Sequence, residues 1–244
     1  MTYCVAIQIE EGLVFLSDSR THAGVDNIAS FRKMSVWQPG DRALVLLTAG
    51  NLAVSQSVVN LLERGVDLGE GRKESLLTVP GMLEAARLVG TAMREIYRLD
   101  AEALKAQGTE YTVSFILGGQ IGDETRLYQI YSAGNFIAAT DETPYFQMGE
   151  NKYGKPIIDR IIRPSTPLGV AAKCALISMD STLRSNLSVG FPLDLALYRR
   201  GSQKLQLRHI TENDPYFNEI CRGWMEGLRA VFEALPDPDW LQGG

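Results

Sequence analysis

The sequence predicts an α+β fold in which antiparallel sheets are covered by pairs of helices. Groups of short strands, mostly joined as hairpins, alternate along the chain with pairs of helices. Because hairpins give antiparallel ladders, we expect antiparallel sheets rather than βαβ units. Helix pairs inserted between strand groups fit helices that cover the outer faces of two stacked sheets. No repeat or long linker interrupts the 244 residues, so we expect one domain over 1–244, with a C-terminal helix and tail at about 215–244.

The first half of the chain opens with two strands. Val5, Ile7 and Ile9 alternate with less apolar residues, which is the period of a half-buried strand, and the second strand covers 13–16 after a turn at Glu11-Gly12. The other elements expected in this half are a strand at 42–49, a helix at about 52–64 between Asn51 and Gly65, and a long amphipathic helix from Pro80 to about 106.

The second half repeats the alternation of strands and helices. Strands are expected at 111–117, 126–131, 136–139 and near Phe146, and helices at about 152–162 and 171–186, separated by Pro164 and Pro167. A hairpin of 193–198 and 204–210 follows, and then a helix at about 215–235 with Asp214 as N-cap.

Composition excludes several classes of function. The net charge is −5 and the basic residues are scattered, so we expect no nucleic-acid partner. The three cysteines are far apart and the two histidines form no HExxH motif, so we expect no metal and no cofactor. The start lacks the pattern of a secretory signal and no segment is long enough for a membrane span, which favours a cytoplasmic protein without a membrane partner.

The chain start carries a candidate nucleophile. Methionine is normally trimmed when a small residue follows it, so Thr2 is expected to become the first residue. A free N-terminal Thr has both a nucleophilic Oγ and a base, its own α-amine. That amine has an ordinary pKa of roughly 7.7–8.0 and is mostly protonated at neutral pH. A nearby cation would lower its pKa, so the site needs a lysine beside Thr2 and a carboxylate to hold that lysine.

Asp18 and Lys33 meet this need. Thr2 and Asp18 are about equally far from the turn at Glu11-Gly12, so hairpin geometry alone brings Asp18 back beside Thr2. Lys33 is less constrained, although Phe31 and Met34 flank it as apolar anchors. Taken singly, Asp18 is a strand-end residue and Lys33 a solvated charge; only the joint pattern indicates an active site.

Several stretches resemble proteasome β subunits and their bacterial relatives. Thr2–Ala6, Ser17–Thr21 and Arg32–Met34 resemble the start of these subunits. Further similarities are Thr48–Gly50, which resembles a glycine-containing loop, Leu127-Tyr128 through Ala133-Gly134 to Met148-Gly149, and Ser188–Gly190 before Leu193–Leu195. The missing propeptide, the Met-Thr-Tyr-Cys start and the extended C-terminal helix are most similar to the Anbu branch, the bacterial ancestral beta subunit.

The resemblance implies a four-layer αββα sandwich, the fold of N-terminal-nucleophile hydrolases, in a ring-like homo-oligomer with its sites facing inward. It implies Thr2 as nucleophile, Lys33 and Asp18 in support, and the Gly50 N–H as oxyanion donor, a contact worth about 2.7–4 kcal/mol in other hydrolases. Thr48, with Thr21 and Ala49, is expected to line a roomy substrate pocket for the side chain that precedes the cut bond. The sequence does not indicate whether an ATPase partner exists.

Two positions depart from the family pattern. Glu150 stands where the family usually has a serine, and Ser185 where it usually has an aspartate. Glu150 could raise the pKa of the α-amine and slow catalysis at neutral pH. Ser188 either completes a hydrogen-bond network around the amine or caps the preceding helix.

Three functions follow from these residues. The first is a threonine peptidase that cleaves peptide or isopeptide bonds through an acyl-Thr2 intermediate, with the α-amine as general base. The second is a non-catalytic shell subunit, which the changes at Glu150 and Ser185 favour. The third is an amidase that acts on a small substrate.

Overall fold

The strands of the chain form two five-stranded antiparallel sheets. The computed structural model describes residues 2–22, 28–69, 71–109 and 111–241. The first sheet contains, in spatial order, β12 (Tyr145–Gly149), β1 (Tyr3–Ile9), β2 (Gly12–Asp18), β13 (Leu193–Arg199) and β14 (Leu205–Ile210). The second contains β11 (Phe136–Ala138), β10 (Glu124–Ile130), β9 (Val113–Ile121), β6 (Arg42–Gly50) and β5 (Met34–Trp37). Two small pairs are β3 (Arg20–His22) with β4 (Ile28–Ser30) and β7 (Val66–Asp67) with β8 (Lys73–Glu74).

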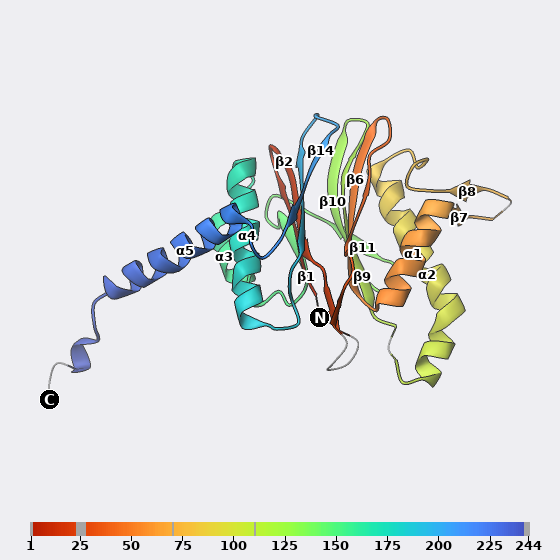
Figure 1. Cartoon of the computed structure of the whole chain (residues 1–244). Coiled ribbons are helices and arrows are strands. Elements are labelled where there is room, and N and C mark those ends of the chain that lie inside the picture. Colours follow the sequence, from red (N-terminus) through yellow and green to blue (C-terminus); the bar gives the residue numbers. More distant parts are fainter. Residues whose placement is uncertain (1, 23–27, 70, 110, 242–244) are drawn as a thin grey trace.

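Helices cover the outer faces of both sheets. They are α1 (Leu52–Arg64), α2 (Met82–Ala106), α3 (Lys155–Ile161), α4 (Leu168–Ser185) and α5 (Pro215–Glu233), followed by a short 3₁₀ turn at Asp239–Leu241. Figure 1 shows α1 and α2 beside the β6–β9 sheet and α3 and α4 beside the β1–β2 sheet. The predicted α+β class with antiparallel sheets is confirmed. No helix in the described ranges is long and apolar enough to cross a membrane.

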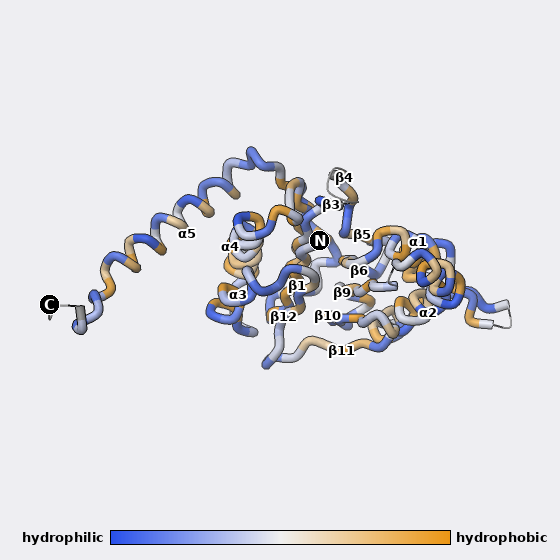
Figure 2. Tube along the Cα trace, turned by 90° about the horizontal axis from the view of Figure 1, so that it is seen from below, coloured by the Kyte–Doolittle hydropathy of each residue, from blue (hydrophilic) through white to orange (hydrophobic). Residues whose placement is uncertain are grey.

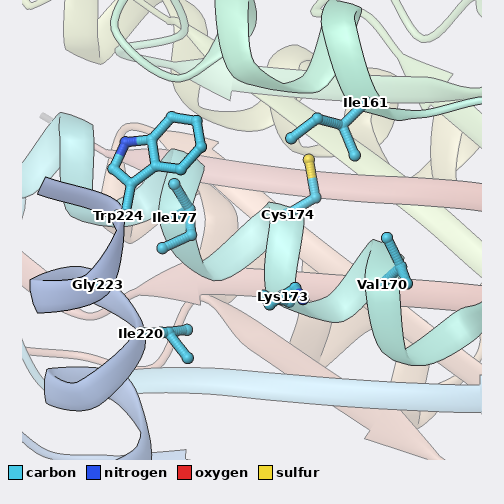
Figure 3. A pocket seen from close by; sticks show the side chains of 8 residues that line it. All are labelled: Ile161, Val170, Lys173, Cys174, Ile177, Ile220, Gly223 and Trp224. Carbon is cyan, nitrogen blue, oxygen red and sulfur yellow. The ribbon is translucent and has the colours of Figure 1, made fainter. Parts of the chain in front are cut away.

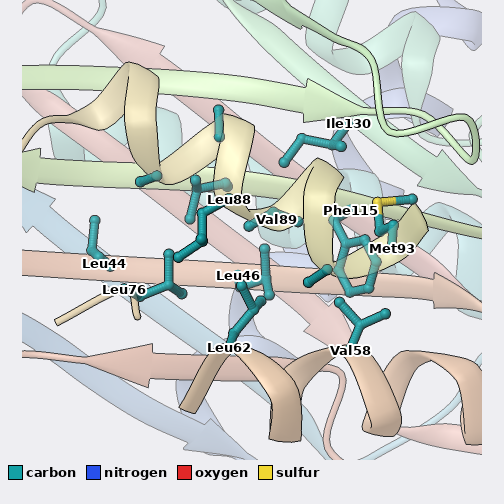
Figure 4. Close-up of a cluster of buried hydrophobic side chains, with 14 of the residues drawn as sticks. Leu44, Leu46, Val58, Leu62, Leu76, Leu88, Val89, Met93, Phe115 and Ile130 are labelled. Atoms are coloured by element: carbon teal, nitrogen blue, oxygen red, sulfur yellow. The ribbon is translucent and has the colours of Figure 1, made fainter. Parts of the chain in front are cut away.

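Three buried apolar clusters join these parts. One lies between α1, α2 and the β6–β9 sheet, and Figure 4 shows Phe115 and Ile130 of the sheet facing Val89 and Met93 of α2. A second lies between the two sheets and includes Phe15. The third joins the β1–β2 sheet to α3 and α4. Each sheet therefore buries both faces, which explains why its central strands are apolar almost throughout.

Alternation along β1 sends its side chains to two different clusters. Tyr3 and Val5 pack toward α4, whereas Cys4 and Ala6 lie between the sheets. Cys4 is fully buried between the sheets. The register pairs Cys4 with Ser17 on β2 and Tyr3 with Gly149 on β12. Both ladders converge on the chain start.

Helix boundaries differ from the prediction where a proline or glycine intervenes. The helix α1 has the predicted bounds, because the Asn51 side chain caps it. The helix α4 begins at Leu168, three residues earlier than predicted, since Pro167 is accommodated at the N-cap. The helix α3 begins only at Lys155, after a turn that contains Gly154. A Cβ at Gly154 would lie 2.1 Å from the Ser178 Oγ, so this turn packs directly on α4.

Candidate active site

Thr2 immediately precedes β1 and is nearly buried, with 9% of its surface exposed. Its carbonyl oxygen accepts a hydrogen bond from the Glu150 N–H at 2.8 Å, so the end of β12 fixes the chain start. Gly149 makes this approach feasible: its φ is +80°, and a Cβ there would lie 1.8 Å from the Thr2 carbonyl oxygen.

Asp18 ends β2 and is completely buried beside the chain start. Its Oδ1 accepts hydrogen bonds from the Tyr3 N–H at 3.0 Å and from the Lys33 ammonium at 2.8 Å. Its Oδ2 accepts from the Gly190 N–H at 3.3 Å. The proximity expected from the hairpin is confirmed, and the carboxylate joins three separate segments of the chain.

Lys33 lies between β4 and β5 and is also buried. Besides its ion pair with Asp18, its Nζ donates to the Arg20 carbonyl at 2.7 Å. Its own carbonyl accepts from the Thr48 N–H at 2.9 Å. The expected apolar anchors are half correct: Met34 is buried, but the Phe31 side chain is 40% exposed. The segment is held at Phe31 by its backbone N–H, which donates to the Ser19 carbonyl at 2.9 Å.

Asp18 and Lys33 form a buried ion pair, and opposing effects act on the pKa of the Asp18 carboxyl. Burial raises the pKa of the Asp18 carboxyl above its ordinary value, while the Lys33 ammonium and the N–H groups of Tyr3 and Gly190 act in the opposite direction. Lys33 therefore supplies the positive charge that keeps a fully enclosed carboxylate in the site. A cation in this position also disfavours a second positive charge at the chain start.

Arg20 and Gly190 support the site and were not predicted from the sequence. The Arg20 Nη1 donates to the Leu187 carbonyl at 2.9 Å, so this side chain ties β3 to the loop before β13. A Cβ at Gly190 would lie 2.1 Å from the Arg20 Nε, so a side chain at this position would have to displace the guanidinium. Arg20 was noted only within the resembling stretch Ser17–Thr21, which assigned it no role.

A cavity of about 830 Å³ opens beside Thr2. Of the predicted site residues it brings together Thr2, Lys33, Gly50, Glu150, Thr21, Thr48 and Ala49. Its other walls, which the sequence did not indicate, are Asn51, Leu52, Ser55, Thr109, Thr112, Ser114 and Gly149. Hydroxyl groups are frequent in this lining, so the cavity suits a polar substrate backbone.

Gly50 ends β6 in this cavity with φ +109°. A Cβ at this position would lie 2.1 Å from the Thr112 carbonyl oxygen, so a side chain would push β6 and β9 apart. The Asn51 N–H donates to the same carbonyl at 2.7 Å. The strand end that would present an oxyanion donor is thus fixed by close backbone packing.

The three supporting residues have different positions. Glu150 lines the cavity, with 14% of its side chain exposed and a 4.0 Å ion pair to Lys152. Ser185 is exposed at the end of α4, and the N–H of Ser188 donates to the Asn186 side chain at 2.9 Å. Within the described residues, neither serine belongs to the cavity lining. The structure therefore brings Glu150, but not Ser185 or Ser188, to the cavity.

A second cavity of about 360 Å³ lies between α4 and α5, and Figure 3 shows that its lining is largely apolar. Its walls come from Cys174 and Ile177 of α4 and from Ile220 and Trp224 of α5, and the Cys174 thiol points into it. Burial raises the pKa of Cys174 to about 12, so this thiol stays protonated and is not a nucleophile at neutral pH. No group of three or more metal-ligating side chains occurs in the described part of the chain.

No protein-family model and no curated protein matches this chain. Solved structures match it over nearly the whole length. Anbu (ancestral beta-subunit) from Yersinia bercovieri is 52% identical, with a TM-score of 0.89 over 97% of this chain and 99% of that one. The Anbu complex from Pseudomonas aeruginosa, described as a helical assembly, is 51% identical, with a TM-score of 0.90 over 97% and 98%. An Anbu (Gly-1) mutant from Hyphomicrobium sp. strain MC1 is 48% identical, with a TM-score of 0.88 over 98% and 100%.

These similarities, together with the two helix-covered sheets, define the chain as a proteasome-like β subunit. More specifically, it belongs to the Anbu family.

Proposed function

We propose that this protein is a threonine-type peptidase subunit, active after removal of Met1, that cleaves peptide or isopeptide bonds through an acyl-Thr2 intermediate. One observation carries the proposal. A single buried oxygen, Asp18 Oδ1, accepts from both the Tyr3 N–H next to Thr2 and the Lys33 ammonium. A shell subunit does not need to bury a charged pair against its chain start, because such a pair contributes little net stability.

In the proposed reaction the Thr2 Oγ gives its proton to its own α-amine, directly or through water, and attacks the substrate carbonyl. The tetrahedral oxyanion is stabilised by the Gly50 N–H. The C–N bond then breaks, and the leaving amine takes the proton back from the Thr2 amine. Water next attacks the Thr2 ester with the same amine as base, which releases the acid and restores Thr2.

Lys33 acts on this reaction without bonding to the substrate. Its charge lowers the pKa of the Thr2 amine and so increases the neutral fraction that can accept a proton. Asp18 holds Lys33 in position. Glu150 opposes Lys33 in the cavity lining, and its charge favours the protonated amine. This opposition sets the pH range in which the site works.

The architecture supports the same assignment. We identify the order of helix pair, sheet, sheet and helix pair with the four-layer αββα sandwich of N-terminal-nucleophile hydrolases, in a single domain (Figure 1). Because a 51% identical relative forms a helical assembly, we propose that this chain forms a homo-oligomer, either ring-like or an open helical ring. Its three free, buried thiols fit a reducing cytoplasm.

The proposal is tested by hydrolysis of peptide and isopeptide substrates by three variants of the intact chain. Thr2→Ser keeps a hydroxyl and an amine and retains activity. Thr2→Ala loses it, and so does a variant with a short N-terminal extension that resists trimming, because an acylated amine is not a base. Hydrolysis that persists in Thr2→Ala contradicts the proposal. Retention of Met1 in the purified protein favours the shell subunit instead.

A further inference from the structure

Glu150 gives the cavity beside Thr2 a negative charge. Lys33 and Glu150 are the two charged residues that line this cavity in the described chain. The Lys33 ammonium is balanced by the buried Asp18 carboxylate, 2.8 Å away. The Glu150 carboxylate has an ion pair with Lys152, but its atoms are 4.0 Å apart and the Lys152 side chain is 68% exposed, so this pair is weak. The cavity is therefore suited to a positively charged ligand.

Glu150 lies beside the amine end of Thr2. The strand β12 is antiparallel to β1 and pairs Gly149 with Tyr3, so the residue after Gly149 lies next to Thr2. The Glu150 N–H donates to the Thr2 carbonyl at 2.8 Å, and both residues line the same cavity. Because the two strands run in opposite directions, the chain leaves β12 on the side from which β1 begins. After removal of Met1, this is the side of the Thr2 α-amine.

The Glu150 side chain is largely removed from water, with 14% of its surface exposed. A carboxylate in such an environment has lost part of its hydration, and a cation that pairs with it compensates for this loss. A fully exposed carboxylate would stay hydrated and would distinguish a charged from a neutral ligand only weakly. The burial of Glu150 therefore allows it to select a ligand by charge.

The proposed reaction determines which part of the substrate lies beside Glu150. The leaving amine takes its proton from the Thr2 α-amine, so the leaving part of the substrate must lie next to that amine. The oxyanion donor, Gly50, belongs to β6 of the other sheet, so the acyl carbonyl is directed away from β12. The first residue of the leaving part is therefore the substrate residue nearest to Glu150.

We propose that Glu150 pairs with a positively charged side chain on the first residue after the cut bond, so that the enzyme selects lysine or arginine there. The inference rests on the proposed function. An acidic side chain at this place would meet a like charge, and an aliphatic one would leave the carboxylate without a partner.

This pairing also acts on the catalytic base. In the free enzyme, Glu150 favours the protonated Thr2 amine, whereas Lys33 disfavours it. A substrate cation that pairs with Glu150 offsets the negative charge, and the pKa of the amine falls. A basic substrate therefore binds more tightly and also increases the neutral fraction of the base.

Hydrolysis of three internally quenched peptides tests the inference. The peptides differ only at the residue after the cut bond, which is Lys, Glu or norleucine, a lysine analogue without the ammonium, and mass spectrometry of the products identifies the cut bond. Near neutral pH, kcat/KM is expected to be about tenfold higher for the Lys peptide than for the norleucine peptide, and high salt reduces this ratio. Equal kcat/KM values for these two peptides overturn the inference and leave the peptidase in place.

Variants of Glu150 show whether its charge is responsible. Glu150→Gln removes the preference for Lys, and Glu150→Lys transfers it to the Glu peptide. With the norleucine peptide, Glu150→Gln moves the midpoint of the kcat–pH profile to lower pH, because the amine loses a neighbouring negative charge. Glu63→Gln, which removes an exposed carboxylate of α1, is the matched control and leaves the preference unchanged. A preference for Lys that survives in Glu150→Gln contradicts the assignment.

Binding separates this inference from the proposed function. Two N-acetylated leaving fragments, which begin with Lys or norleucine, are titrated onto the Thr2→Ala protein by calorimetry, so that no catalysis is required. Tighter binding of the Lys fragment without hydrolysis of any peptide by the Thr2 protein supports the subsite and contradicts the peptidase. Equal binding of the two fragments overturns the inference, whether or not the peptides are cut.

Discussion

At the scale of single residues, the site depends on Asp18. Its carboxylate accepts from Tyr3 of β1, Lys33 of the β4–β5 connection and Gly190 before β13, so one side chain sets the mutual position of three segments. A buried ion pair of this kind contributes little to the free energy of unfolding. The loss of one partner, however, leaves the other charge unpaired in the interior, which is strongly destabilising.

Lys33→Met is therefore expected to lower the free energy of unfolding by about 3–5 kcal/mol. The double variant Lys33→Met with Asp18→Asn removes both charges and is expected to recover part of this loss, with a coupling of about 1 kcal/mol or more. Urea unfolding of the wild type, both single variants and the double variant measures the coupling. Strictly additive losses would show that the two side chains do not interact.

The pH dependence follows from the same carboxylate. Burial raises the pKa of Asp18 above the ordinary value of 3.8. As the pH falls, this carboxylate is therefore protonated at a higher pH than an exposed aspartate. Protonation removes the charge that holds Lys33, so the ion pair is present above this raised pKa and is lost below it. A ¹³C NMR titration of the Asp18 carboxyl is expected to give a midpoint above 3.8. A midpoint at or below that value is inconsistent with control by desolvation.

At the scale of elements, glycines at strand ends allow the backbones around Thr2 to meet. Gly149 ends β12 and Gly50 ends β6, both with positive φ and with a carbonyl oxygen within about 2.1 Å of where a Cβ would stand. No side chain can be accommodated there without moving a strand.

Gly149→Ala is expected to destabilise the protein by more than about 1 kcal/mol. Alanine is strained at a φ of +80°, and its Cβ would displace the Thr2 carbonyl. Gly169→Ala is the matched control, since it lies in the first turn of α4 with open space around its Cβ, and it is expected to be neutral or stabilising by up to about 1 kcal/mol. Thermal unfolding of both variants provides the comparison. A fully stable Gly149→Ala protein would mean that β12 does not constrain the chain start.

Elements with local signals were predictable. The bounds of α1 follow from its two caps: the Asn51 side chain caps the N-terminus, and the Gly65 backbone N–H caps the C-terminus. The strands β3, β4, β7 and β8 were missed because each has only two or three residues, too few to show a period. The strand β5 has four residues and was also missed.

The site was predictable to different extents. The position of Asp18 beside Thr2 follows from the equal arms of one hairpin. Lys33 was proposed from the need for a cation beside the Thr2 amine, but the sequence constrained its position less, because no strand pattern between β2 and β5 fixes it. Gly190 was noted only within the resembling stretch Ser188–Gly190, and its contact with Asp18 could not be predicted, since it joins residues 172 positions apart.

At the scale of the whole molecule, α5 extends away from the two sheets, and only its first turns pack on the body (Figure 1). Figure 2 shows apolar and polar positions alternating along its projecting part. Met225, Leu228, Phe232 and Leu235 recur at helical spacing and are 37–77% exposed. If the chain forms the homo-oligomer proposed above, this exposed apolar face is where a second copy is expected to pack.

Leu228→Ser with Phe232→Ser is expected to shift the protein to smaller species, because both side chains leave the contact between copies. Analytical ultracentrifugation of the variant and of Arg229→Gln, a polar substitution on the same helix, measures the effect. An unchanged distribution of the double serine variant would exclude this face from the assembly.

The central claim is that Thr2 is a nucleophile with its own amine as base. It is tested most directly by the intact mass of the untagged protein before and after treatment with a peptide epoxyketone, since this warhead closes its ring only on a Thr hydroxyl and a free α-amine together. We predict loss of Met1 and one adduct per chain, absent in Thr2→Ala. A mature chain that keeps Met1, or an adduct that survives in Thr2→Ala, would contradict the claim.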